Sequence, residues 1–398
     1  MISTLLLLII YLSFISLGLP DGLLGSAWPA MYKNLSVPMH YAGIISMITA
    51  GGAVISALFS GKIINRFGTG IITFISVFIT AITLIGFSLS HDFVVLCFWA
   101  ISLGLGAGTV DSALNNYVAV HYKAKHMNWL HCFWGVGASI GPLIMSAHLV
   151  NGGMWTQGYR TVGIIQCCLV IVLLISLPLW SKNAAQKQQV STKTDKPVTY
   201  RTLLGIPGLK HMLIVFFCYC TIEAVTGLWG SSYLVAKRNV SPENAARWIA
   251  LFFIGITAGR FISGFLSMKF TNRQMVRLGQ WIIACGILAL FLPMDSFLML
   301  TFFIIGLGCA PIFPSLIHET PENFSSRYSQ IIVGMQMSSA YIGITIMPLF
   351  FGRLAGYLDF SIFPLFLGFV LIIMIVITEM GNRSIDVQKK ILSDKTIK

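Results

Sequence analysis

Residues 61–70 read Gly-Lys-Ile-Ile-Asn-Arg-Phe-Gly-Thr-Gly, and a similar segment, Gly264-Phe-Leu-Ser-Met-Lys-Phe-Thr-Asn-Arg273, lies in the second half of the chain. Each follows an apolar stretch long enough to cross a bilayer. Two further pairs recur in the same relative order, namely Gly104-Leu-Gly-Ala-Gly108 with Gly306-Leu-Gly-Cys-Ala310, and residues 133–143 with residues 340–349. Three echoes at corresponding places predict two halves that share one fold.

The composition places both halves in a membrane. Hydrophobic residues make up 56% of the chain, charged residues only 10%, and the mean hydropathy is +0.83. So much apolar surface cannot be hidden in a soluble core. Stretches of about 20 apolar residues, the length of a membrane-spanning helix, recur along the chain. We place them at 3–31, 41–61, 69–89, 93–119, 127–149, 159–180, 210–235, 246–267, 274–293, 296–317, 329–352 and 360–380.

These spans predict an all-α membrane protein of about twelve transmembrane helices in two pseudo-symmetric six-helix bundles. Only one long stretch, Ser181–Pro207, is polar, basic and poor in apolar residues, which indicates a linker between the bundles. The predicted units are therefore an N-terminal bundle (1–180), the linker (181–207), a C-terminal bundle (208–382) and a tail (383–398).

The formal charge of +13 does not indicate a nucleic-acid partner, because the cations are distributed asymmetrically. Of the 26 Lys and Arg residues, 19 lie on one side of the predicted spans, together with the linker and both chain ends. This is the positive-inside pattern, and it predicts that both termini are cytoplasmic. We expect a multi-pass protein of the cell membrane, with the lipid bilayer as its surroundings.

Enzyme chemistry has little support in the sequence. There is no Walker-type phosphate loop, no His-Glu-x-x-His and no Gly-x-Ser-x-Gly pattern. The eight cysteines fall within apolar stretches without the spacing of metal ligands. We therefore expect no cofactor, no metal site and no enzymatic activity.

Three acidic residues lie inside predicted spans, where a charge is costly and indicates a functional site. They are Asp21, next to Pro20 and Gly22, together with Asp111 and Glu223. We interpret all three as proton-coupling or substrate sites. Pro20 and Gly22 predict a break in the first span, so a role for Asp21 as a mere helix interruption stays open, whereas a cleavable signal sequence is disfavoured because no basic start and no cleavage site accompany it.

Polar residues share helix faces with these acids. Asn115 follows Asp111 by one turn, so the two side chains should point together. His131 precedes Trp134 by three residues, and the pair is a candidate substrate contact, with a core histidine as the alternative. Arg260 is buried deeply enough in its span to need either an acidic partner or a route to the cytoplasmic interface.

Other candidates rest on weaker signals. Trp28 and Trp229 lie near Asp21 and Glu223 and offer flat faces on which a sugar ring could stack. Gln336 is polar enough to line a cavity, although single polar residues in membrane helices often only join helices.

The chain resembles the major facilitator superfamily over nearly its whole length. The 61–70 loop is similar to the superfamily signature between helices two and three, with Gly61, Arg66 and Gly68 in place as structural or gating residues, while Asn65 replaces the usual acid. Segments 20–29, 111–116 and 130–142 resemble the fucose permease branch. That resemblance implies coupling acids at Asp21 and Asp111, and polar substrate contacts at Asn115, Asn116 and His131.

Together these observations predict a proton-coupled symporter of a sugar or a similar hydroxylated solute that works by alternating access, as a monomer. A proton-driven efflux carrier for drugs or other amphipathic molecules is the main alternative, and a receptor or lipid sensor is a further one. The small-molecule substrate and protons are the expected partners.

Overall fold

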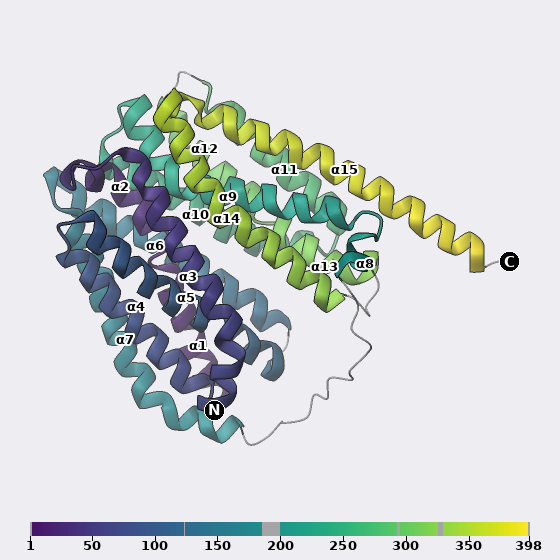
Figure 1. The fold of residues 1–398 in the computed structure, drawn as a ribbon, viewed down its shortest axis with the longest axis horizontal. Coiled ribbons are helices and arrows are strands. Elements are labelled where there is room, and N and C mark those ends of the chain that lie inside the picture. Colours follow the sequence, from purple (N-terminus) through teal and green to yellow (C-terminus); the bar gives the residue numbers. More distant parts are fainter. Residues whose placement is uncertain (1, 123, 185–199, 293–294, 325–328, 397–398) are drawn as a thin grey trace.

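The computed structural model describes residues 2–122, 124–184, 200–292, 295–324 and 329–396, and in these residues the only regular elements are helices (Figure 1). The predicted all-α class is confirmed. The central part of the predicted linker, 185–199, lies outside the described residues. Residues 383–396, expected as a tail, continue the last helix.

The helices form two groups that follow each other along the chain (Figure 1). The N-terminal bundle contains α1 (Ile2–Gly18), α2 (Leu23–Asn34), α3 (Ala42–Phe67), α4 (Thr69–Leu89), α5 (Phe93–His121), α6 (Ala124–Leu149) and α7 (Trp155–Ala184). The C-terminal bundle contains the short α8 (Tyr200–Leu204), then α9 (Leu209–Arg238), α10 (Pro242–Leu266), α11 (Asn272–Ala289), α12 (Asp295–Cys309), α13 (Ile312–Phe324), α14 (Ser329–Leu358) and α15 (Phe363–Thr396). Short 3₁₀ turns precede α3, α7 and α15.

Within the described residues, 11 segments are long and apolar enough to span a membrane, with α1 and α2 forming one and α12 and α13 another. Helix α11 is not among them because its first half carries Arg273, Gln274 and Arg277. It nevertheless packs between α12, α13 and α15, in the place of a ninth span. The prediction of about twelve membrane helices therefore agrees with the structure.

The first span is broken where the sequence predicts it. Helix α1 ends at Gly18, the chain turns through residues 19–22, and α2 begins at Leu23. The turn satisfies its own backbone groups, since Asp21 N donates to Gly18 O at 3.1 Å and Leu23 N to Pro20 O at 3.1 Å. The break therefore presents the Asp21 side chain without leaving these amides unpaired.

Glycines hold this turn against α6. A Cβ atom on Gly18 would lie 2.1 Å from the carbonyl oxygen of Trp134, and one on Gly137 would lie 2.0 Å from that of Ile15. The two backbones are therefore in direct contact, as small residues permit in membrane helices. This contact fixes the position of the α1–α2 turn relative to Trp134.

The glycines that recur in the two halves make the same kind of close helix–helix contact in each half. A Cβ on Gly104 of α5 would lie 2.1 Å from Thr49 O of α3, and one on Gly306 of α12 would lie 2.0 Å from Phe252 O of α10. Equivalent helices of the two bundles are thus packed through equivalent glycines. This agreement supports the predicted repeat.

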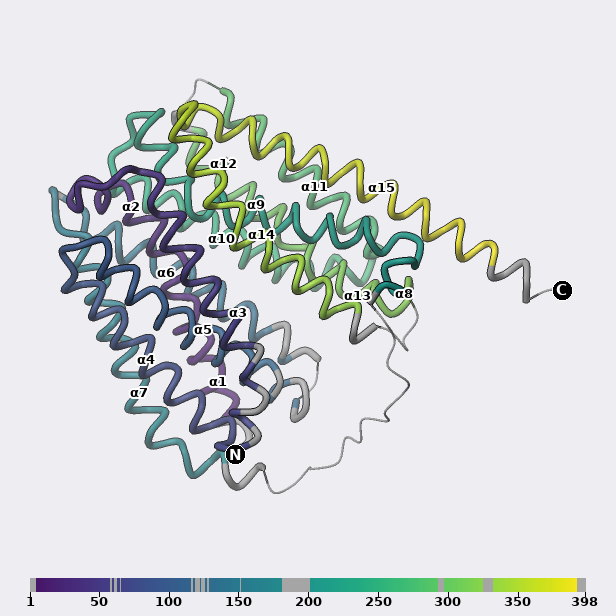
Figure 2. Tube along the Cα trace, viewed as in Figure 1, coloured from purple at the N-terminus to yellow at the C-terminus, as the bar shows by residue number. Residues whose placement is uncertain are grey.

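The bundles meet through α6 with α10, α3 with α14, and α2 with α9 and α10. On the side away from both termini, Ser146 Oγ donates to Glu243 O at 2.7 Å, and a Cβ on Gly25 would lie 2.2 Å from Gly227 O. The bundles converge at this far side and diverge toward the terminal side, where the N terminus and α8 lie (Figures 1 and 2).

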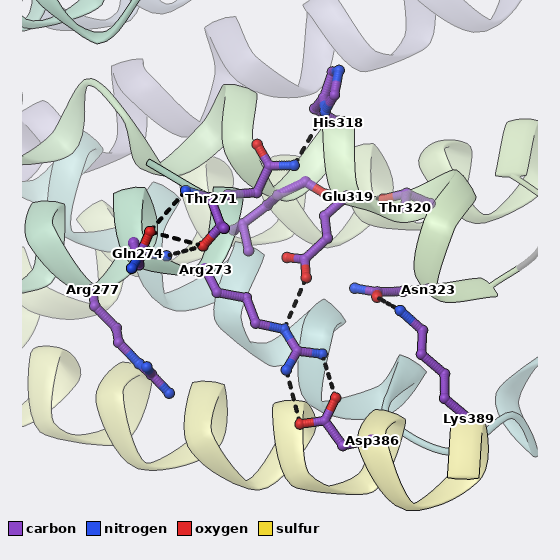
Figure 3. Close-up of polar contacts among 12 residues, drawn as sticks. Thr271, Arg273, Gln274, Arg277, His318, Glu319, Thr320, Asn323, Asp386 and Lys389 are labelled. Carbon is purple, nitrogen blue, oxygen red and sulfur yellow. Dashed lines mark hydrogen bonds and ion pairs between the residues drawn. The ribbon is translucent and has the colours of Figure 1, made fainter. Parts of the chain in front are cut away.

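On the terminal side of the C-terminal bundle, charged residues tie three helices together (Figure 3). Arg273 of α11 lies 3.0 Å from Glu319 of α13 and 2.8 Å from Asp386 of α15. Arg277 of α11 pairs with Glu379 of α15 at 2.7 Å. The extension of α15 beyond residue 382 is therefore anchored to the bundle.

Candidate functional site

Asp21 is the centre of the site. Its side chain is exposed although it lies in the interior of the first span, and its Oδ2 accepts a hydrogen bond of 2.7 Å from Trp134 Nε1. The contact joins the α1–α2 turn to α6. The carboxylate is thus held by a neutral donor in a place that water can reach.

Asp111 and Asn115 of α5 point together, as their spacing predicts. Asn115 Nδ2 donates to Asp111 Oδ1 at 2.8 Å and to the Asp111 carbonyl oxygen at 3.0 Å. Both side chains are half-buried. Again the partner of the acid is neutral.

Glu223 of α9 has the same kind of partner. The hydroxyl of Tyr219, one turn earlier, donates to Glu223 Oε2. Tyr219 was not among the residues predicted from the sequence. The signal was present, because a tyrosine four residues before an intramembrane acid lies on the same helix face.

The three acids converge between the bundles. Asp21 interacts electrostatically with both Asp111 and Glu223, and Tyr341 of α14 interacts with Asp111. These groups come from both bundles and are exposed or half-buried although they lie in the interior of their spans. The arrangement is a polar, solvent-accessible site at the bundle interface.

Arg260 of α10 adds a positive charge to this interface. Its guanidinium carbon lies 5.0 Å from the centroid of the Trp134 ring, and Nη1 donates to the His131 carbonyl oxygen at 3.4 Å. In the described part of the chain no carboxylate lies within 4.0 Å of it. The salt bridge that the sequence allowed for Arg260 is not seen among the described residues, and the guanidinium lies over the indole ring instead. An extension of Arg260 toward the cytoplasmic interface stays a prediction.

His131 itself is half-buried, with its ring edge-on to Phe14 at a centroid distance of 6.0 Å. It lies on the face of α6 that carries Trp134, and it is within electrostatic reach of Arg260. The structure therefore brings His131, Trp134 and Arg260 together beside Asp21.

Three predicted contacts lie elsewhere. Trp28 is fully buried and donates to Met39 O at 2.5 Å, while Trp229 is fully buried and donates to Pro348 O at 2.8 Å. Gln336 is fully buried and hydrogen-bonded to Thr320 at 2.9 Å. Their polar atoms are used to join segments of the fold, so these three residues do not line the site in this conformation.

The loop residues have local roles. Gly68 has a φ of 82°, which favours glycine, and its N–H donates to Ile64 O at 2.7 Å, closing α3. Arg66 is exposed and lies over the ring of Phe67. Gly61 and the Asn116 side chain lie outside the part of the chain whose side-chain surroundings the structure describes.

Metal chemistry finds no support at this site. Among the described residues, no group of three or more His, Cys, Asp or Glu side chains is placed to hold a metal ion.

The fold and the interior polar site define a multi-pass membrane protein of the transporter class. The family model of the Major Facilitator Superfamily matches residues 10–247 and 211–381, and the chain belongs to this superfamily. It is therefore a transporter of small molecules and not an enzyme, in agreement with the sequence analysis.

Curated relatives match over most of their length. The chain is 24% identical to a cis,cis-muconate transport protein of Acinetobacter baylyi over 79% of this chain and 78% of that protein. It is 21% identical to a glucose/mannose transporter of Bacillus subtilis, with 86% of each covered, and 22% identical to a quinolone resistance protein of Staphylococcus aureus, with 87% of each covered.

The fold also matches solved structures. A bacterial homologue of the human lysosomal transporter Spinster, in an inward-facing and occupied conformation, superposes with a TM-score of 0.74 at 13% sequence identity, covering 96% of this chain and 97% of that one. At this identity the likeness concerns the fold alone.

Proposed function

We propose that this protein is a proton-coupled symporter of a hydroxylated solute, such as a sugar, that works by alternating access. One observation carries the proposal: three acids converge at the bundle interface, and each is hydrogen-bonded to a neutral side chain rather than to a cation. A carboxylate fixed by a cation keeps its charge, whereas one held by a neutral donor can bind and release a proton without leaving a cation unpaired.

Asp21 is the proposed principal coupling site. It lies in a turn between two half-helices, it is accessible, and its indole partner is held in place by the glycine contact of α1 with α6. Rocking of the bundles about their far-side contact would change the side of the membrane from which Asp21 is reached. Proton binding would then follow the direction in which the site opens.

The neighbouring groups suit a polar solute. Asn115 and His131 are half-buried and supply hydrogen-bonding groups, and Trp134 supplies an aromatic face. The resemblance to the fucose permease branch supports a sugar in general. At Gly18, however, the backbone of Trp134 leaves no room for a side chain, so α1 offers no side-chain contact to a solute at that position.

Efflux of amphipathic molecules is the second candidate. The relation to the quinolone resistance protein and the exposed Asp21 favour it. The guanidinium of Arg260 beside Trp134 disfavours a cationic drug, because it places a like charge next to the aromatic face that such a drug would use.

We also propose that the protein works as a monomer in the cell membrane. The asymmetric distribution of cations supports an orientation with both termini in the cytoplasm. In this orientation the far side of the molecule, where the bundles touch, faces outward.

The test is transport by the purified protein in proteoliposomes under an imposed pH gradient. Labelled D-glucose, D-galactose, L-fucose and the sugar acid D-glucuronate are offered for uptake, and ethidium for extrusion. Accumulation of a sugar that a protonophore abolishes supports symport. Gradient-driven extrusion of ethidium without sugar accumulation supports efflux, and failure of both overturns proton-coupled transport.

A further inference from the structure

At the bundle interface the acids have side-chain hydrogen-bond partners, whereas Arg260 has a backbone partner alone among the described residues. Each of the three acids accepts a hydrogen bond from a side chain, at 2.7 Å for Asp21 and 2.8 Å for Asp111. In the described part of the chain, Arg260 makes one hydrogen bond, a long one of 3.4 Å to a backbone oxygen. A guanidinium has five N–H donors, so most of those of Arg260 have no acceptor within the described residues.

An arginine at membrane depth is costly unless its charge is compensated. The ring of Trp134, whose centroid lies 5.0 Å from the guanidinium carbon, compensates part of the cost, but it offers no oxygen acceptor to the N–H groups. By contrast, Arg273 of the same bundle has two carboxylates within 3.0 Å. Within the described residues, Arg273 therefore has acidic partners and Arg260 has none within 4.0 Å.

The orientation of Arg260 is nevertheless fixed. Trp134 is held by its own N–H, which donates to Asp21, and the guanidinium carbon of Arg260 lies over the ring so held. Tyr219 is within electrostatic reach of Arg260 and also binds Glu223, so the arginine borders the same site as the acids. A planar, oriented guanidinium with open donors is the geometry that binds a carboxylate through two parallel hydrogen bonds.

We propose that Arg260 binds a carboxylate of the transported solute, so that the preferred substrate is a hydroxylated carboxylic acid of the sugar-acid class rather than a neutral sugar. The inference rests on the proposed transport function and narrows its substrate class. Asn115 and His131 then bind hydroxyl groups. Asp21 remains at the Nε1 edge of Trp134 while Arg260 lies over the ring, so the proton is kept apart from the anion.

Arg247 offers a matched control. It belongs to the same helix as Arg260, carries the same charge and is exposed on the far side. Arg260→Gln and Arg247→Gln therefore remove one positive charge each from α10, and only the first removes it from the site. Arg260→Lys keeps the charge and loses the planar fork.

The experiment measures counterflow of labelled solute in proteoliposomes with two pairs of probes, D-glucuronate against D-glucose and D-gluconate against D-glucitol. In the unaltered protein, at least one acid should compete about 10-fold to 100-fold better than its neutral partner, the range expected for a charge-assisted hydrogen-bond pair. Arg260→Gln should remove this preference, Arg260→Lys should reduce it, and Arg247→Gln should leave it unchanged.

A neutral sugar that is transported as well as its acid partner by the unaltered protein would overturn the inference and leave the proposed symport intact. An acid preference that survives in Arg260→Gln would overturn it as well. If neither acids nor neutral sugars exchange, the proposed function fails and the inference fails with it. The comparison of probes in the unaltered protein needs no variant, so poor folding of Arg260→Gln would not prevent the test.

Discussion

Two arginines of the C-terminal bundle have different kinds of partner. Arg273, on the terminal side, lies within 3.0 Å of Glu319 and Asp386. Arg260, at the bundle interface, has an aromatic ring in place of an acid, while the acids nearby bind neutral donors. The first region fixes charges in pairs and joins helices (Figure 3). The second keeps positive and negative groups apart, which leaves each free to meet a proton or a solute.

The largest effect on the bundle-interface site is expected from a substitution of Asp21. In Asp21→Asn the amide oxygen can still accept the hydrogen bond from Trp134, so the fold should persist. The site can no longer exchange a proton, and uptake should only equilibrate the solute. The unaltered protein should accumulate it about 10-fold for each pH unit and coupled proton. Labelled-solute uptake under an imposed pH gradient measures this difference.

Asp111→Asn is the companion experiment. It should also abolish accumulation while exchange of solute across the membrane continues, because the amide imitates the protonated acid. Full concentrative uptake by either variant, with its normal response to pH, would remove that acid from the coupling mechanism.

Substitutions in the ion pairs of the terminal side should change the stability of the protein rather than its transport activity. Arg273→Met leaves Glu319, which is 6% exposed, without its cation, and should lower the free energy of unfolding by about 3 kcal/mol. Arg277→Met is the matched control, since its pair with Glu379 is exposed and should contribute less than about 1 kcal/mol. Thermal unfolding in detergent compares the two. Equal losses of stability in the two variants would show that burial of the ion pair does not determine its contribution here.

Much of this arrangement follows from the sequence. The twelve-helix plan, the break at Pro20 and Gly22, and the shared face of Asp111 and Asn115 depend on local rules of length, backbone chemistry and helical spacing.

What the sequence could not show depends on contacts between distant segments. Burial of Trp28 against Met39 O, and the position of Arg260 over Trp134, are set by how helices pack and not by spacing along one helix. The same holds for the pairing of Arg273 with Asp386, which lie on different helices. A tryptophan that is close to an acid in sequence therefore lies in the same region of the fold as that acid. The sequence does not show whether the indole ring is accessible to a solute or buried.

Asn115 and His131 of the bundle-interface site are expected to affect solute binding. If both contact the solute, Ala at either position should weaken binding by about 1–3 kcal/mol, the cost of leaving a polar partner unpaired. Competition binding to the purified protein gives the two affinities. Ser338→Ala is a control on an exposed side chain that bonds only within α14. Unchanged affinity in both site variants would assign Asn115 and His131 to the scaffold.

The smallest effect is expected for the ion pair of Lys237 with Asp359 on the far side. Both side chains are partly exposed, at 33% and 42%, so Asp359→Asn should cost less than about 1 kcal/mol. The hydrogen bond from Lys237 holds the pKa of the Asp359 carboxyl below its ordinary value of 3.8. The pair therefore contributes fully above pH 3.8 and its contribution is lost as the pH falls through the lowered pKa.

Asp359→Gly separates charge from backbone at this position. Asp359 has a φ of 113° and a ψ of 154°, a region that only glycine adopts readily and that costs other residues about 1–3 kcal/mol. Both variants lose the ion pair, but the glycine variant also loses the strain. It should therefore unfold at a higher temperature than Asp359→Asn in the same detergent at pH 7. A glycine variant that is less stable than the asparagine variant would show that hydrogen bonding by the side chain, as in the contact with Ser361, outweighs the backbone strain.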